Sequence, residues 1–133
     1  MKGFIPHAVD GSNRAQALEY FPASAITPKK GMALYFSSGL LAACTGTTKP
    51  EYICMYEGPT LTSGDVIPVM RILPDRIYET AWSTTGTSIN VGQKVTIAAD
   101  SLRITATTSS GVAEVVGKAD TAAENDPVFV RFP

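Results

Sequence analysis

The chain has 133 residues, of which 44% are apolar and 17% are charged, and its formal net charge is −1. A chain of this length forms one domain and needs neither a metal nor a disulfide to fold. The near-neutral charge without a basic stripe argues against nucleic-acid binding, and no apolar run approaches the roughly 18 residues of a membrane span.

Residues 1–28 differ from the rest and are expected to form an N-terminal arm. They contain three prolines and scattered aromatic residues. Good helix formers allow a short helix over 14–20, but Pro22 ends it within about two turns, and so short a helix is marginal alone. We therefore expect an arm that is irregular or holds a short helix, laid along the body or docked on a partner.

Residues 29–133 are expected to form a single β domain. Apolar and polar residues alternate in short runs separated by turn residues. Some runs are apolar on both faces, which is typical of a closed barrel covered by another layer or subunit. Pro68 predicts an edge strand or a bulge, because proline cannot donate to a ladder. The expected strands are 32–37, 40–45, 51–57, 65–73, 76–82, 93–98, 101–106, 112–119 and 127–132.

The body repeats itself imperfectly with a period of 61 residues. Gly31 and Gly92 are separated by this distance, and so are Asp65 and Asp126. Both aspartates precede the last strand of their copy, where we expect each to hydrogen-bond its own backbone in a turn. A fixed period of this kind indicates a duplicated structural unit.

Each copy reads as strand, tight turn, strand, Thr-rich loop, strand, longer loop and strand. The copies span about 29–73 and 90–133, with tight turns at 37–39 and 99–100. The segment 74–89 links them and is expected to hold a strand and a loop without a counterpart. The sequence therefore predicts an all-β fold, a small β-barrel or sandwich built from two pseudo-repeated four-stranded units, with an extended N-terminal arm.

The two cysteines are expected to be reduced and to fill apolar space. Cys44 and Cys54 do not form a metal-binding pair, and no His/Cys cluster accompanies them. The N-terminus lacks the apolar core of a secretory signal, so no oxidising compartment is expected. A disulfide across a hairpin is the alternative.

No pattern predicts catalysis. His7 is the single histidine, and a Ser-His-Asp or Cys-His site would require it to reach from the arm into the body. Phosphate-binding, zinc-protease and EF-hand motifs are absent from the sequence. We therefore expect a protein that is not an enzyme and has no catalytic residues, no cofactor and no metal. The acidic residues expected at turns or on the surface, rather than as a glycosidase pair, are Glu51, Glu57, Asp65, Asp75 and Glu79.

Aromatic residues on the predicted strands admit two interpretations. Flat rings can form a platform for sugars, but strands are enriched in aromatic residues that serve as core or interface anchors. We favour the second interpretation. The residues concerned are Tyr35, Tyr52, Tyr56, Tyr78 and Trp82.

Three stretches carry a resemblance to a known family. They are PASAITPKKGMALYFSSGLLAACTGTTKPEYICMYEG from Pro22, SGDVIPVMRI from Ser63 and the terminal VFVRF. With these turn-and-strand patterns the chain resembles the small virion proteins of tailed bacteriophages known as capsid decoration, cement or auxiliary proteins. The resemblance covers most of residues 22–133.

The resemblance implies a small β-barrel that binds the outside of an assembled capsid in many copies and bridges its subunits, without an active site. The implied partners are the major capsid protein and neighbouring copies, a homotrimer by family analogy, and the implied location is the virion exterior after synthesis in the host cytoplasm. A tail, baseplate or fibre component that binds a protein or a glycan is the alternative. The expected contact residues are Phe4, Ile5, Pro6, Tyr20, Phe21 and Trp82.

Overall fold

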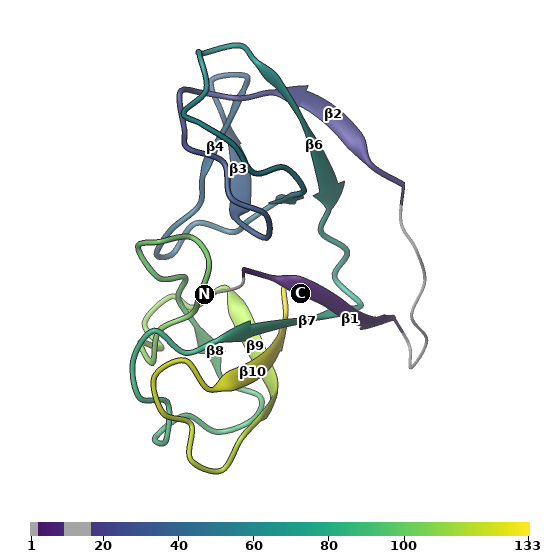
Figure 1. Cartoon of the computed structure of the whole chain (residues 1–133). Coiled ribbons are helices and arrows are strands. Elements are labelled where there is room, and N and C mark those ends of the chain that lie inside the picture. The colour runs from purple at the N-terminus through teal and green to yellow at the C-terminus, as the bar shows by residue number, and fades with distance from the viewer. Residues whose placement is uncertain (1–2, 10–16) are drawn as a thin grey trace.

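A computed structural model describes residues 3–9 and 17–133, and for residues 6–9 the backbone only. Throughout this part the fold is all-β, as the sequence predicts, and no helix occurs in it. Ten strands form two five-stranded antiparallel sheets, one above the other in Figure 1. The arrangement is sandwich-like, and the described strands do not form a closed barrel.

The upper sheet in Figure 1, called the N-terminal sheet, has the strand order β2-β6-β5-β3-β4. Its strands are β2 (Glu19–Pro22), β3 (Ala33–Ser37), β4 (Leu40–Ala43), β5 (Tyr52–Cys54) and β6 (Val66–Arg71). The lower, C-terminal sheet has the order β1-β7-β10-β9-β8. Its strands are β1 (Ile5–Val9), β7 (Arg76–Ala81), β8 (Lys94–Val95), β9 (Ala113–Lys118) and β10 (Pro127–Arg131).

The 61-residue repeat is visible in the hydrogen bonds. The N–H of Gly31 donates to the carbonyl oxygen of Cys54 at 2.8 Å, and the N–H of Gly92 donates to that of Val115 at 2.7 Å. Both glycines have a positive φ, 92° and 98°, which glycine adopts without strain. Residues at this spacing therefore occupy equivalent places in the two sheets.

The linker 74–89 has a counterpart, contrary to the prediction. Its strand β7 pairs with β10 as β2 pairs with β6. Just after β2 the N–H of Ser24 donates to the carbonyl oxygen of Leu41 at 2.9 Å, and just after β7 that of Ser83 donates to Ile104 at 2.8 Å. Each unit therefore starts one strand earlier than predicted, and in the first unit that strand comes from the presumed arm.

The N-terminal arm is part of both sheets. β1 pairs with β7, and β2 pairs with β6. Glu19 and Tyr20 lie in β2, so the helix expected over 14–20 does not extend to them; residues 14–16 lie outside the described part. The arm is therefore laid along the body, which was one of the two expected arrangements, but its described residues form paired strands where an irregular segment or a short helix was predicted.

Pro68 lies in a strand with neighbours on both sides, where the sequence predicted an edge or a bulge. β6 lies between β2 and β5. The carbonyl oxygen of Pro68 accepts from the N–H of Met55 at 3.0 Å, one residue beyond the end of β5 at Cys54. The missing N–H of Pro68 therefore faces Met55, just beyond the end of β5, so proline omits the bond that would have continued the ladder there and removes none within β5 itself.

The hairpin turns differ between the copies. Ser38 and Gly39, both with positive φ, form the predicted two-residue turn between β3 and β4. The equivalent turn is wider, because the N–H of Ala98 donates to the carbonyl oxygen of Arg103. The strands expected at 93–98 and 101–106 consequently shrink to β8 and an isolated bridge between Ile97 and Ile104.

The core is divided into two clusters that share strand β5. Tyr52 and Cys54 pack in the cluster of the N-terminal sheet, whereas Ile53 packs in that of the C-terminal sheet. Ala33 of β3 joins Ile53 on the same side. At β3 and β5, the apolar second face that the sequence assigned to another layer or subunit is thus covered by the other half of the same chain.

The backbones of Gly3 and Gly31 pass close to each other where the N-terminal segment meets the body. The N–H of Phe4 donates to the carbonyl oxygen of Gly31 at 2.8 Å. A Cβ atom at Gly31 would lie 2.7 Å from the Cα atom of Gly3, a distance that side chains do not tolerate. This contact sets the path by which Phe4 enters the core beside Phe132, at a ring-centroid distance of 5.4 Å.

We expect Gly31→Ala to destabilise the fold more than Gly92→Ala, its repeat-equivalent control. Both positions have a φ near +95°, which costs an alanine about 1–2 kcal/mol, but nothing lies within 4 Å of a Cβ atom at Gly92. The clash with Gly3 should add about 1–3 kcal/mol to the loss at Gly31. Denaturant unfolding measures both variants, and equal losses would contradict the crossing.

Candidate functional site

The two aspartates that the sequence places in equivalent turns hydrogen-bond to the backbone. The carboxylates of Asp65 and Asp126 accept from the N–H groups of Thr62 and Ala123, each at 2.9 Å, so both close the predicted turns. The hydrogen bond from Thr121, with that from Ala123, lowers the pKa of Asp126. These carboxylates therefore hold loops in place.

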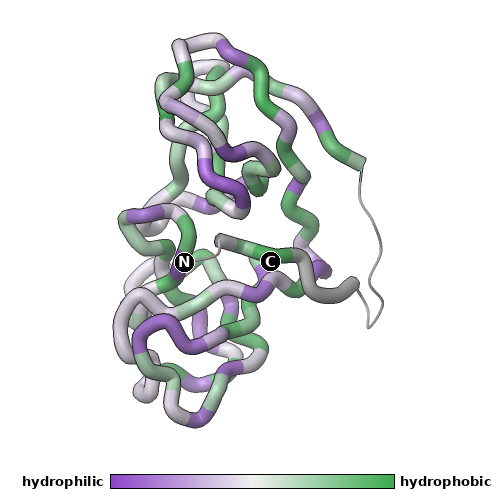
Figure 2. Tube along the Cα trace, viewed as in Figure 1, coloured by the Kyte–Doolittle hydropathy of each residue, from purple (hydrophilic) through white to green (hydrophobic). Residues whose placement is uncertain are grey.

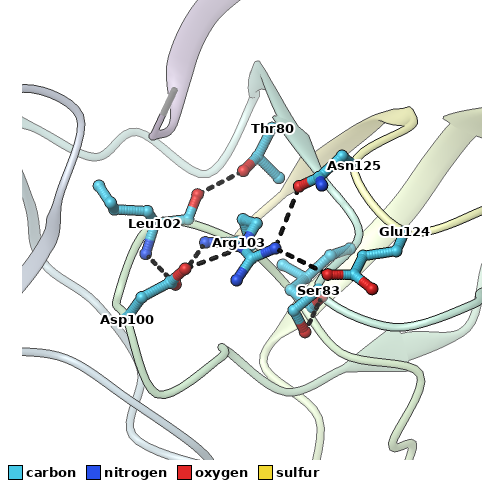
Figure 3. A network of polar contacts seen from close by, with 8 residues as sticks. Thr80, Ser83, Asp100, Leu102, Arg103, Glu124 and Asn125 are labelled. Carbon is cyan, nitrogen blue, oxygen red and sulfur yellow. Dashed lines mark hydrogen bonds and ion pairs between the residues drawn. The ribbon is translucent and has the colours of Figure 1, made fainter. Parts of the chain in front are cut away.

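The most connected polar cluster joins a turn of the C-terminal sheet to the loop before β10 (Figure 3). Arg103 donates to Asp100 at 2.8 Å and to the side-chain oxygen of Asn125 at 3.0 Å. Burial acts to raise the pKa of Asp100, but hydrogen bonds from Leu102 and Arg103 outweigh it and the pKa is lowered. These contacts join the turn at 100–103 to the loop at 124–125, so the role of the cluster is to fix the two loops.

The described residues contain no group of three or more His, Cys, Asp or Glu side chains able to hold a metal ion. The side chain of His7 lies outside the described part. Within that part, no helix is long and apolar enough to cross a membrane.

Cys44 and Cys54 are both free and buried, in different core clusters. The alternative of a disulfide between them is therefore not realised. Burial, with a smaller contribution from the charge of Glu51, raises the pKa of Cys44 to about 12. Burial likewise raises the pKa of Cys54.

Two of the six expected contact residues are buried inside the chain. Phe4 is 1% exposed and packs against Phe132, and Trp82 is fully buried. The backbone of Gly86 lies against the indole ring, where a Cβ atom would approach to 2.4 Å. Because neither side chain is exposed to solvent, the expectation that they contact a partner is wrong.

The other four expected residues lie in different surroundings. Phe21 is partly buried and packs against Phe36 and Tyr52. Ile5 is exposed in β1, and the backbone of Pro6 pairs with Tyr78, while the Pro6 side chain is outside the described part. Tyr20 is 64% exposed. The structure therefore does not bring the six together, and Tyr20 is the most accessible of those whose side chains it describes.

Tyr20 belongs to an exposed apolar surface on the N-terminal sheet. Tyr20 lies opposite Pro68 and Pro22 lies opposite Val66, so these four side chains share one face. Val66 is 60% exposed, and Leu18, just before β2, is 43% exposed. We call Leu18, Tyr20, Pro22, Val66 and Pro68 the β2–β6 apolar face.

A hollow borders this face. It has a volume of about 340 Å³, is lined in part by Val66 and Pro68, and is flanked by the half-exposed ring of Tyr56. Apolar residues along β6 appear as green stretches in Figure 2. Contiguous exposed apolar surface with an adjacent hollow is typical of protein-binding sites.

The β2–β6 apolar face is exposed because the other half of the chain covers only part of this side of the sheet. Ala33 and Ile53 are buried against the C-terminal core. β2 and the start of β6 extend beyond it, toward the upper end of the molecule in Figure 1. Sequence reasoning missed Leu18, Val66 and Pro68, because a valine in a predicted strand gives no signal of which face it occupies.

Comparison with protein-family models gives no match for this chain, and no curated protein matches it. The geometry of the exposed surface is therefore the basis on which function is considered.

We expect both thiols to be unreactive in the folded protein. With a pKa of about 12, Cys44 is almost entirely protonated at pH 8, and thiolate is the reactive species. Dithionitrobenzoate should label neither cysteine in native protein and both in denatured protein. The raised pKa also implies that stability, full below pH 9, falls as the pH rises toward 12.

Rapid labelling of one thiol at pH 8 without loss of the native circular dichroism spectrum would contradict the burial of that cysteine. Cys44→Ala and Cys54→Ala variants assign the reacting residue.

Proposed function

We propose that the protein is a virion structural protein that binds the outer surface of an assembled bacteriophage capsid and stabilises it by bridging capsid subunits. The observation that carries the proposal is the β2–β6 apolar face, on which Leu18, Tyr20 and Val66 are exposed among the described residues. The resemblance of the sequence to decoration proteins supplies the identity of the partner, the major capsid protein.

The β2–β6 apolar face suits protein binding because its backbone is held in place. The opposite side of β2 places Phe21 in an aromatic cluster with Phe36 and Tyr52, at ring-centroid distances of 5.2 Å. Arg71 of β6 donates two hydrogen bonds to Glu19 of β2, at 3.0 and 3.1 Å. A surface fixed in this way loses little conformational freedom when it binds.

Tyr20 is the expected anchor of the contact. Tyrosine is enriched among residues that dominate binding energy, because its ring buries a large area and its hydroxyl keeps a hydrogen bond. Val66 and Pro68 flank it on the same face. A single small contact of this kind is weak, but many copies on one shell, each touching neighbouring capsid subunits, gain avidity.

We expect the double variant Tyr20→Ser, Val66→Thr to bind purified heads at least about tenfold more weakly than the wild type, which corresponds to about 1.4 kcal/mol. Both side chains are exposed, so the fold should persist. Co-sedimentation with heads that lack the protein measures the binding, and circular dichroism checks the fold.

Val91→Thr is the matched control. Val91 is as exposed as Val66, at 61% against 60%, but lies in the C-terminal half of the chain, and its replacement should leave binding unchanged. Undiminished binding of the double variant would remove the β2–β6 apolar face from the mechanism. Binding of the wild type to tails and not to heads would instead support the tail or baseplate alternative.

A further inference from the structure

The two sheets differ at one equivalent edge. β1 lies along the outer edge of β7, with Ile5 opposite Glu79 and Ala8 opposite Ile77. β2 is the repeat-equivalent of β7, but no described strand lies along its outer edge. The edge that is completed by an antiparallel strand in the C-terminal sheet thus has no such strand among the described residues of the N-terminal sheet.

The outer edge of the first half of β2 is not paired with β4, because β4 begins only opposite the end of β2. The two strands meet at a parallel bridge between Ala23 and Leu41, and β4 begins at Leu40. The C-terminal sheet has the same bridge, between Trp82 and Ile104. In Figure 1 the start of β2 projects away from β4, and no described strand pairs with the outer edge of β2 at residues 18–20.

The register shows which backbone groups this edge presents. Tyr20 lies opposite Pro68, which has no N–H and whose carbonyl oxygen accepts from Met55 on the side of β5. Tyr20 and Pro68 are therefore a non-hydrogen-bonded pair, and the N–H and C=O of Tyr20 point outward. Those of Leu18, two residues earlier, point the same way. The edge offers two donors and two acceptors.

We propose that β2 pairs with β2 of a second copy of the chain, antiparallel about a two-fold axis at Glu19, which gives a dimer where the family resemblance implies a homotrimer. In this register Leu18 lies opposite Tyr20 of the other copy. Four backbone hydrogen bonds then satisfy the four outward groups of each copy. The chain has a single β1, which already pairs with β7. No other described strand is left to complete the β2 edge, and a second copy can complete it because β2 is complementary to itself.

Side chains at the β2 edge agree with this register. The Leu18–Tyr20 pairs join two apolar side chains on the exposed face, and Arg71 balances the charge of each Glu19 beside the axis. Pro22 disfavours the register centred on Tyr20, because that register places Pro22 opposite Leu18 and proline has no N–H to donate. The paired copies form one ten-stranded sheet that carries two β2–β6 apolar faces side by side.

Cross-linking tests the register without any capsid, so its outcome is independent of the proposed function. Glu19 lies opposite itself in a non-hydrogen-bonded pair, where Cα atoms are about 4.5 Å apart and a disulfide fits. We expect Glu19→Cys to form a disulfide-linked dimer under mild oxidation, seen by non-reducing electrophoresis. Val91→Cys, an exposed control, should not, and the buried native cysteines contribute no background.

Sedimentation equilibrium of the unmodified chain provides the second measurement. We expect a concentration-dependent dimer that Leu18→Pro weakens at least about tenfold, since this variant removes an outward N–H without touching the β2–β6 ladder. Wild-type protein that stays monomeric at all concentrations, or Glu19→Cys that links no faster than Val91→Cys, would overturn the proposal. The cross-linking result decides if Leu18→Pro fails to fold.

Discussion

The structure depends on the burial of both faces of β5 and β3. Tyr52 and Cys54 pack in one core cluster, and Ile53 packs in the other. The three-residue strand β5 therefore contributes side chains to both clusters. Each sheet alone would expose apolar side chains on its second face, and covering them is the main driving force for packing the halves together. The backbone bridge between Gly46 and Ile97 fixes how the halves meet.

The two repeated units have the same arrangement of strands. Their surfaces differ at the edge formed by β7 in one sheet and by β2 in the other. In the C-terminal sheet, β1 covers the edge of β7, while Phe4 inserts between the halves and meets Phe132. In the N-terminal sheet the equivalent edge and the adjoining β2–β6 apolar face have no described cover. An open edge next to exposed apolar side chains is costly in a solitary protein, which is why we assign both to contacts with other molecules.

The polar side chains contribute by fixing loops. Arg103 joins two turns through Asp100 and Asn125 (Figure 3), and Asp65 and Asp126 close equivalent turns before β6 and β10. These charge-assisted bonds satisfy groups that would be costly to leave unpaired at the rim of a core. They keep the strand ends in register, and the surface that we propose for partner contact consists of apolar residues.

The sequence alone determined the all-β class, the 61-residue period, the Ser38–Gly39 turn and the alternation along β5, because these follow from local backbone preference and side-chain periodicity. It misassigned the arm, the linker strand, Pro68, Phe4 and Trp82, since their places depend on which distant strands pair with them. The face made of Tyr20, Val66 and Pro68 was likewise decided by tertiary structure. Periodicity shows that a strand has two faces, but only the packing of the two halves decides which face remains exposed to solvent.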